Sequence, residues 1–128
     1  MKSFTDLSQS KVLAKILPLE SADMYYFTII RDYPYSQGKN KTITKIMDGS
    51  FSSDYDTPCW SLAALLSVIP KHIKDYNVLR IDISDNDFAI WYDEIGYGVN
   101  NDLPNITMES AVDACYEMII KLHELKML

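Results

Sequence analysis

The clearest pattern in the sequence is an alternation of apolar and polar positions in two adjoining segments, residues 78–84 and 87–93. A period of two residues predicts strands that bury one face. Asp85 and Asn86 lie between the segments, and both residue types tolerate left-handed backbone, which favours a two-residue hairpin turn. A slip of one residue would move the apolar side chains to opposite faces, so the register is well specified. The predicted pairs are Leu79 with Tyr92, Ile81 with Ile90, Ile83 with Phe88 and, on the other face, Arg80 with Trp91.

The segment 57–70 has the strongest helical pattern. Thr57 is a suitable N-cap, and Pro58 fits the first helical position because a proline lacks the N–H that would have no partner there. Only two serines interrupt the apolar residues that follow. A helix without a polar face is expected to be buried on most sides, so Leu65 and Leu66 should be almost wholly buried.

Further elements are predicted on either side of these. Residues 5–17 indicate a helix with Thr5 as the N-cap, and residues 109–126 indicate a last helix. Residues 22–31 and 41–47 are rich in β-branched and aromatic types, which favours strands. The predicted fold class is α+β, with three helices, a mostly antiparallel sheet of about four strands and the order α-β-β-α-β-β-α. We expect a single domain over 1–128, with loops at 32–40, 48–56 and 96–105.

Charge is unevenly distributed along the chain. The net charge is −6, yet the segment 81–109 has no Lys or Arg and carries the acids Asp82, Asp85, Asp87, Asp93, Glu94, Asp102 and Glu109. The stretch 31–45 is basic but too small for non-specific nucleic-acid binding, so we expect no nucleic-acid partner. No apolar run is long enough to span a membrane, and the first residues lack a signal-peptide pattern. A cytoplasmic location is therefore expected.

The candidate chemistry of the chain is limited. Cys59 and Cys115 lie within apolar helical patterns and are predicted to be reduced, buried and unreactive. Cys59 at the start of a helix would be an activated thiolate if a histidine were close, but His72 follows the end of the same helix. The hairpin acids do not match a calcium-binding loop, because the required Gly and Glu are missing. The sequence therefore predicts no catalytic residue, no metal ligand and no cofactor.

Aromatic residues in polar loops are the best candidates for a binding surface. Tyr33, Tyr35, Phe51 and Tyr55 lie in stretches rich in Ser, Asp, Asn and Lys. Tyrosine is favoured at protein interfaces because its stiff ring offers a large contact area and a hydroxyl. The alternative is that these rings fold back onto the sheet and extend the core.

Three blocks together carry a family resemblance. They are SADMYY at 21–26, PCWSLAALL at 58–66 and VDACYEMIIKL at 112–122. The chain resembles a family of small hypothetical proteins from gut Bacteroides-type genomes and their phages or mobile elements. This resemblance implies a cytoplasmic setting and a mobile-element origin. It implies no activity, so no catalytic residue is carried over.

Three functions are compatible with the sequence, and the first is favoured over an enzyme and over a mimic. The first is a non-enzymatic protein-interaction module of phage or mobile-element origin that uses residues 32–56 to bind an unknown protein partner. The second is a small enzyme that uses Cys59 or the acidic residues. The third is an acidic mimic or inhibitor that presents the hairpin to a basic partner. The sequence does not specify the oligomeric state.

Overall fold

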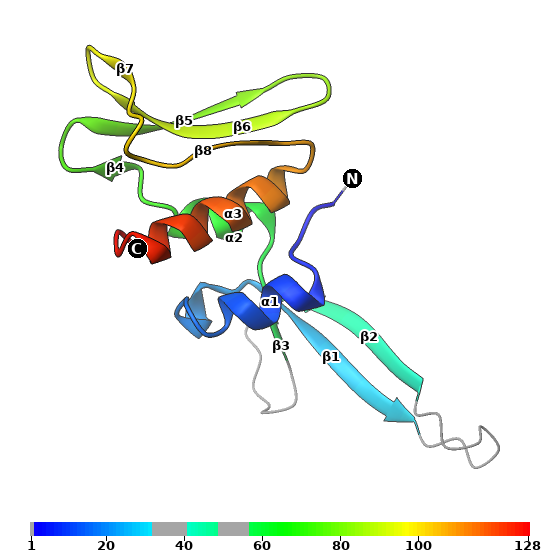
Figure 1. The fold of residues 1–128 in the computed structure, drawn as a ribbon. Coiled ribbons are helices and arrows are strands. Elements are labelled where there is room, and N and C mark those ends of the chain that lie inside the picture. The colour runs from blue at the N-terminus through cyan, green and yellow to red at the C-terminus, as the bar shows by residue number, and fades with distance from the viewer. Residues whose placement is uncertain (1, 32–40, 49–56) are drawn as a thin grey trace. The chain divides into compact units, whose positions relative to one another are not determined.

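The computed structural model describes residues 2–31, 41–48 and 57–128 (Figure 1). It has helices and mostly antiparallel strands, which confirms the α+β class. The predicted strand count and order differ from the structure, because the described strands form a three-stranded and a five-stranded sheet, and the added strands at 57–59, 72–73, 98–99 and 105–108 are too short to show a period-two pattern. The chain divides into two compact units: unit 1 comprises Met1–Thr5 and Ser61–Leu128, and unit 2 comprises Asp6–Trp60. The expectation of a single domain stays a prediction. None of the helices in the described ranges is long and apolar enough to cross a membrane.

Unit 2 contains a helix, a short 3-10 turn and a three-stranded antiparallel sheet. Strand β1 (Met24–Arg31) lies between β2 (Lys41–Asp48) and β3 (Thr57–Cys59). Helix α1 (Leu7–Leu13) contacts β3, and the 3-10 turn η1 (Leu19–Ser21) precedes β1. The indole N–H of Trp60 donates to the Ser21 hydroxyl oxygen over 2.9 Å, which satisfies the polar atom of a fully buried ring.

The first helix is shorter than predicted and has a different N-cap. Asp6, rather than Thr5, caps α1: its carboxylate accepts from the Gln9 N–H, and the Gln9 side chain accepts from the Asp6 N–H. This reciprocal capping box satisfies two backbone donors at once, which explains why the helix begins one residue later. Thr5 is fully buried instead.

The central helix also begins later than predicted, because Thr57 and Pro58 belong to strand β3. A residue before proline is driven to extended backbone, and an edge strand tolerates the missing proline N–H. Ser61 is the N-cap, and its hydroxyl accepts from the Ala64 N–H over 3.2 Å. Helix α2 therefore spans Leu62–Val68.

Unit 1 consists of α2, helix α3 (Ala111–Glu124) and a second antiparallel sheet. In that sheet β4 (His72–Ile73), β5 (Asn77–Ile83), β6 (Phe88–Glu94) and β7 (Gly98–Val99) are neighbours in this order, and β8 (Asn105–Met108) also pairs with β6. Helix α3 packs along one face, against β6, β8 and α2 (Figure 1). Because α3 carries its buried side chains toward β6 and β8, the core lies between this helix and the middle of the sheet.

The hairpin prediction is confirmed residue by residue. Strands β5 and β6 pair Ile83 with Phe88, and the rest of the predicted register follows. The Ser84 N–H donates to the Asp87 carbonyl oxygen over 2.9 Å, which closes the two-residue turn. The prediction of a loop over residues 96–105 was only partly correct, because β7 and the start of β8 lie in this segment. Both strands are short, and β8 follows Pro104, so the local pattern favoured a loop.

The core of unit 1 confirms one of the two expectations for the central helix. Leu65 is fully buried, whereas Leu66 is only half-buried and Ala63 is exposed. One side of α2 is therefore accessible, although it carries no charged residue. The other buried side chains of unit 1 include Ile69, Ile90, Tyr92, Val112, Met118, Ile119 and Leu122.

Candidate functional site

The predicted aromatic site falls outside the described residues. Tyr33 and Tyr35 lie in 32–40, and Phe51 and Tyr55 lie in 49–56. Their role in partner binding therefore stays a prediction.

The cysteines lie in buried structural positions. Cys59 is the last residue of strand β3 rather than the start of a helix, so no helix N-terminus stabilises its thiolate. Cys115 lies on the buried face of α3, and burial raises the pKa of its thiol to about 12, although Lys71 opposes part of this effect. Both cysteines are free and buried. Neither has the exposure that a nucleophilic thiol needs.

Two tyrosines are equally unsuited to acid–base chemistry. Burial raises the pKa of Tyr92, whose hydroxyl donates to the Pro70 carbonyl oxygen over 2.6 Å. The pKa of Tyr26 in unit 2 is also raised, mainly by burial and to a lesser extent by the nearby Cys59. Both phenols stay protonated near neutral pH. Within the described ranges, no three His, Cys, Asp or Glu side chains converge to hold a metal ion.

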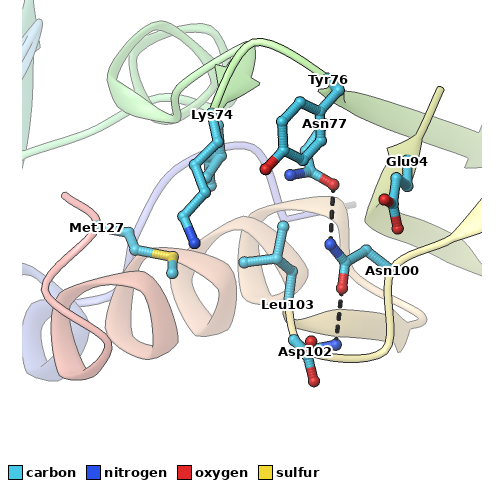
Figure 2. A pocket seen from close by; sticks show the side chains of 9 residues that line it. Lys74, Tyr76, Asn77, Glu94, Asn100, Asp102, Leu103 and Met127 are labelled. Carbon is cyan, nitrogen blue, oxygen red and sulfur yellow. Dashed lines mark hydrogen bonds between the residues drawn. The ribbon is translucent and has the colours of Figure 1, made fainter.

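Unit 1 has a polar pocket of about 240 Å³ beside the β4–β5 turn. Figure 2 shows Lys74 and Met127 on one side of this pocket and Glu94 and Asn100 on the other. Asn77, which is 2% exposed, accepts a hydrogen bond from the Asn100 side-chain amide over 2.9 Å. The Asn100 side-chain oxygen in turn accepts from the backbone N–H of Asp102 over 2.9 Å.

These hydrogen bonds give the polar pocket a structural role. Asn100 uses both its amide N–H and its oxygen within the protein, so it fixes the segment after β7 to the start of β5. Lys74 and Asp75, in the turn between β4 and β5, have positive φ angles, of 46° and 29°, as a tight turn requires. The charged groups that remain, from Lys74, Glu94 and Asp102, have opposite signs and do not define one ligand.

A second recess, of about 410 Å³, lies at the tip of the β5–β6 hairpin. We call it the hairpin groove. Its walls come from the hairpin tip, from the first residues of α2 and α3, and from the N-terminal segment. Its apolar lining includes Leu62, Ile83, Phe88 and Ala111, and its polar lining includes Lys2, Asp85, Asp87 and Glu109.

On the outer side of strand β5 next to this groove, backbone groups have no partner strand among the described residues. Strand β4 covers β5 only as far as Leu79, whose N–H donates to the Lys71 carbonyl oxygen over 2.9 Å. Backbone groups of an antiparallel strand point alternately to its two sides. The backbone N–H of Ser84 points toward β6. Because Ile81 and Ile83 are an odd number of residues away from Ser84, their N–H and C=O groups point outward, as those of Leu79 do. We call residues 80–83 the open edge, since no strand in the described part of the chain pairs with their outer side.

The apolar face of β5 is also incompletely covered along the open edge. Ile83 is 75% exposed and Ile81 is 39% exposed, although their partners Phe88 and Ile90 on β6 are buried. Helix α3 packs on β6 and β8 rather than on β5, so its cover ends before the edge strand. An edge with exposed apolar side chains is a template for another strand, and most proteins protect such edges.

The charges around the open edge and the hairpin groove are mainly negative. Asp82, Asp85, Asp87 and Glu109 are exposed and form no ion pair with the described residues. The two neighbouring cations are already paired. Lys2 Nζ lies 2.7 Å from an Asp113 carboxylate oxygen, and Arg80 Nε lies 3.3 Å from an Asp93 carboxylate oxygen.

Comparisons with protein-family models, with curated proteins and with solved structures give no match to this chain. The resemblance drawn from residues 21–26, 58–66 and 112–122 therefore stays a prediction.

The hairpin acids were recognised in the sequence, but the open edge and the groove were not. Alternation predicts that Ile81 and Ile83 share a face with Ile90 and Phe88, and says nothing about where the helix cover ends. The structure supplies the missing observation: β4, His72–Ile73, is too short to cover its seven-residue partner β5.

Proposed function

We propose that this protein is a non-enzymatic protein-interaction module that binds a partner along the open edge and the hairpin groove. The observation that carries the proposal is the exposure of Ile83 beside backbone groups of the same strand that no described strand pairs. It combines an apolar contact surface with main-chain donors and acceptors, which are the elements of strand-addition recognition.

This proposal is favoured over an enzyme by the placement of the reactive groups. The two thiols and two perturbed phenols of the described residues are buried, and the polar pocket uses its amides internally. The same proposal includes two further points. The first is that the partner also contacts Tyr33, Tyr35, Phe51 and Tyr55, and the second is that the protein originates from a phage or mobile element.

Site-specific photo-crosslinking tests the proposed function. A photoreactive amino acid replaces Ile83 in the full chain, and the partner that crosslinks in a lysate of the native host is identified and purified. The matched control carries the same group at Ile95, which is exposed in the turn after β6. The purified partner should crosslink from position 83 and not from position 95, and Ile81→Asp should weaken its binding at least about tenfold.

Two results would contradict the proposal. If positions 83 and 95 gave the same products, the open edge would not be a specific surface. If the partner crosslinked from position 35 and was unaffected by Ile81→Asp, binding would belong to the predicted aromatic loop instead.

A further inference from the structure

We infer that the open edge and the hairpin groove receive an extended, positively charged segment of a partner protein, which adds to β5 as a further strand. This inference rests on the proposed function and specifies its ligand: a segment in which Lys or Arg alternates with apolar residues.

The backbone geometry explains why the partner segment is extended. Among the described residues, hydrogen bonding on the outer side of β5 includes the bond between Leu79 and Lys71 and does not continue toward Ile83. The next outward-pointing groups along the strand belong to Ile81 and Ile83. A strand placed there continues an existing ladder, so it meets donors and acceptors at the normal spacing without any rearrangement of the hairpin.

The apolar positions of the partner follow from the face that the helices leave uncovered. Alternate side chains of an added strand would lie beside Ile81 and Ile83, on the same face as the groove residues Leu62 and Phe88. Apolar side chains of the partner at these positions would be removed from water, together with the surface of Ile83, which is 75% exposed.

The charge of the partner follows from the acids at the surface. Asp82, Asp85 and Asp87 line the strand and the turn, and Glu109 lies across the groove. Because Lys2 and Arg80 are held by Asp113 and Asp93, these four carboxylates are not neutralised within the described residues. A cationic segment complements them, and such complementarity mainly increases the association rate and the discrimination against wrong partners.

The same charges argue against other occupants. A second copy of this chain carries a net charge of −6, so two copies repel each other at long range. Nucleic acids have anionic phosphates and would meet the acids directly. A partner protein with a basic strand-forming segment is therefore the occupant that the surface fits.

Binding of synthetic peptides to the full-length protein tests the inference. The probe is a fluorescent pool of eight-residue peptides in which Lys alternates with Val, Ile, Leu, Phe or Tyr. The control pool has Glu in place of Lys. The Lys pool should bind at least about tenfold more tightly than the Glu pool, and its affinity should fall when NaCl is raised from about 50 to about 500 mM.

Charge variants locate the binding. The triple variant Asp82→Asn, Asp85→Asn, Asp87→Asn should bind the Lys pool about tenfold more weakly than the unmodified protein. The matched control is Asp75→Asn, Asp102→Asn, Glu124→Gln, which removes the same charge from exposed positions elsewhere in unit 1. Equal loss of affinity in both variants would mean non-specific attraction and would overturn the inference.

Amide hydrogen exchange tests strand addition directly. On binding the Lys pool, the amides of Ile81 and Ile83 should exchange at least about tenfold more slowly, because they become hydrogen-bonded. The amides of Asp82 and Ser84 already point toward β6 and should change little. Absence of binding, absence of this alternating protection, or dimerisation through β5 seen by sedimentation would each overturn the inference.

The two proposals fail in different ways. A partner that crosslinks from position 83 but has no basic segment, and protects no β5 amide, leaves the interaction module standing and removes the strand-addition ligand. If no specific crosslink forms at position 83, the proposed function itself is lost.

Discussion

Ile83 and Phe88 are direct cross-strand partners on one face of the sheet, yet Phe88 is buried and Ile83 is 75% exposed. The difference arises because α3 packs on β6 and β8 and leaves the outer part of β5 uncovered. Two apolar residues with the same pattern in the sequence therefore have different roles, one in the core and one at a surface.

This difference is testable by truncation of each side chain. Ile83→Ala should change the free energy of unfolding by no more than about 0.5 kcal/mol, as at other surface positions. Phe88→Ala removes a buried ring and should cost about 3–5 kcal/mol. Denaturant unfolding followed by circular dichroism measures both. A large cost at Ile83 would show that it packs in the free protein and would remove the basis of the open edge.

Helix α2 should respond unequally at its two central leucines. Leu65→Ala should cost about 2–5 kcal/mol, because Leu65 is fully buried. Leu66→Ala should cost clearly less, since Leu66 is half-buried. Equal unfolding midpoints for the two variants would contradict the described orientation of the helix.

Ser61 should be the residue that caps α2. Ser61→Ala removes the acceptor for the Ala64 N–H and should cost about 0.5–2 kcal/mol. Ser61→Asp retains a capping oxygen and should preserve most of the stability, which separates the cap from other effects of the substitution. If the two variants had the same unfolding midpoint, capping would not be the reason that α2 begins here.

Stability should fall at alkaline pH, and Cys115 should account for the first part of the fall. Burial raises the pKa of its thiol from 9.0 to about 12. Above pH 9 the unfolded chain loses this proton while the folded protein keeps it, so the contribution is complete below pH 9 and is lost toward pH 12. The raised pKa values of Tyr26 and Tyr92 act in the same direction above pH 10, their ordinary value.

The measurement compares unfolding midpoints between about pH 8 and 10, below the main tyrosine contribution. Cys115→Ala and Cys115→Val lack the thiol, so their stability should change less over this interval than that of the unmodified protein. The comparison uses the slope with pH, because both substitutions also alter packing. Identical slopes in all three proteins would show that the thiol does not cause the effect.

The sequence predicted the elements with strong periodicity and missed those that depend on tertiary context. The β5–β6 register followed from alternation and from the turn residues Asp85 and Asn86, because a slip would have separated the apolar faces. The start of α2 was misplaced, because Thr57 and Pro58 satisfy the rules for a helix start as well as those for an edge strand. Only pairing with Tyr25 and Tyr26 of β1 decides between them.

The candidate site was less predictable than the fold. The acids at 82, 85 and 87 were visible in the sequence. Their role in attracting a cationic partner depends on Lys2 and Arg80 forming ion pairs with other carboxylates, which only the structure shows. The polar pocket joins Asn77 to Asn100, which are 23 positions apart, through a contact that no local pattern indicates. The predicted set Tyr33, Tyr35, Phe51 and Tyr55 lies outside the described residues and stays a prediction.

The division into units has a consequence for synthesis on the ribosome. Unit 2 is one uninterrupted stretch, Asp6–Trp60, so all its residues are present once Trp60 has left the exit tunnel. Unit 1 is discontinuous: it needs residues near the start of the chain, and β6 has no cover until α3 has been made. The apolar face of the β5–β6 hairpin has no helix to pack on until α3 has left the exit tunnel, so unit 1 completes its core only after unit 2 has all of its residues.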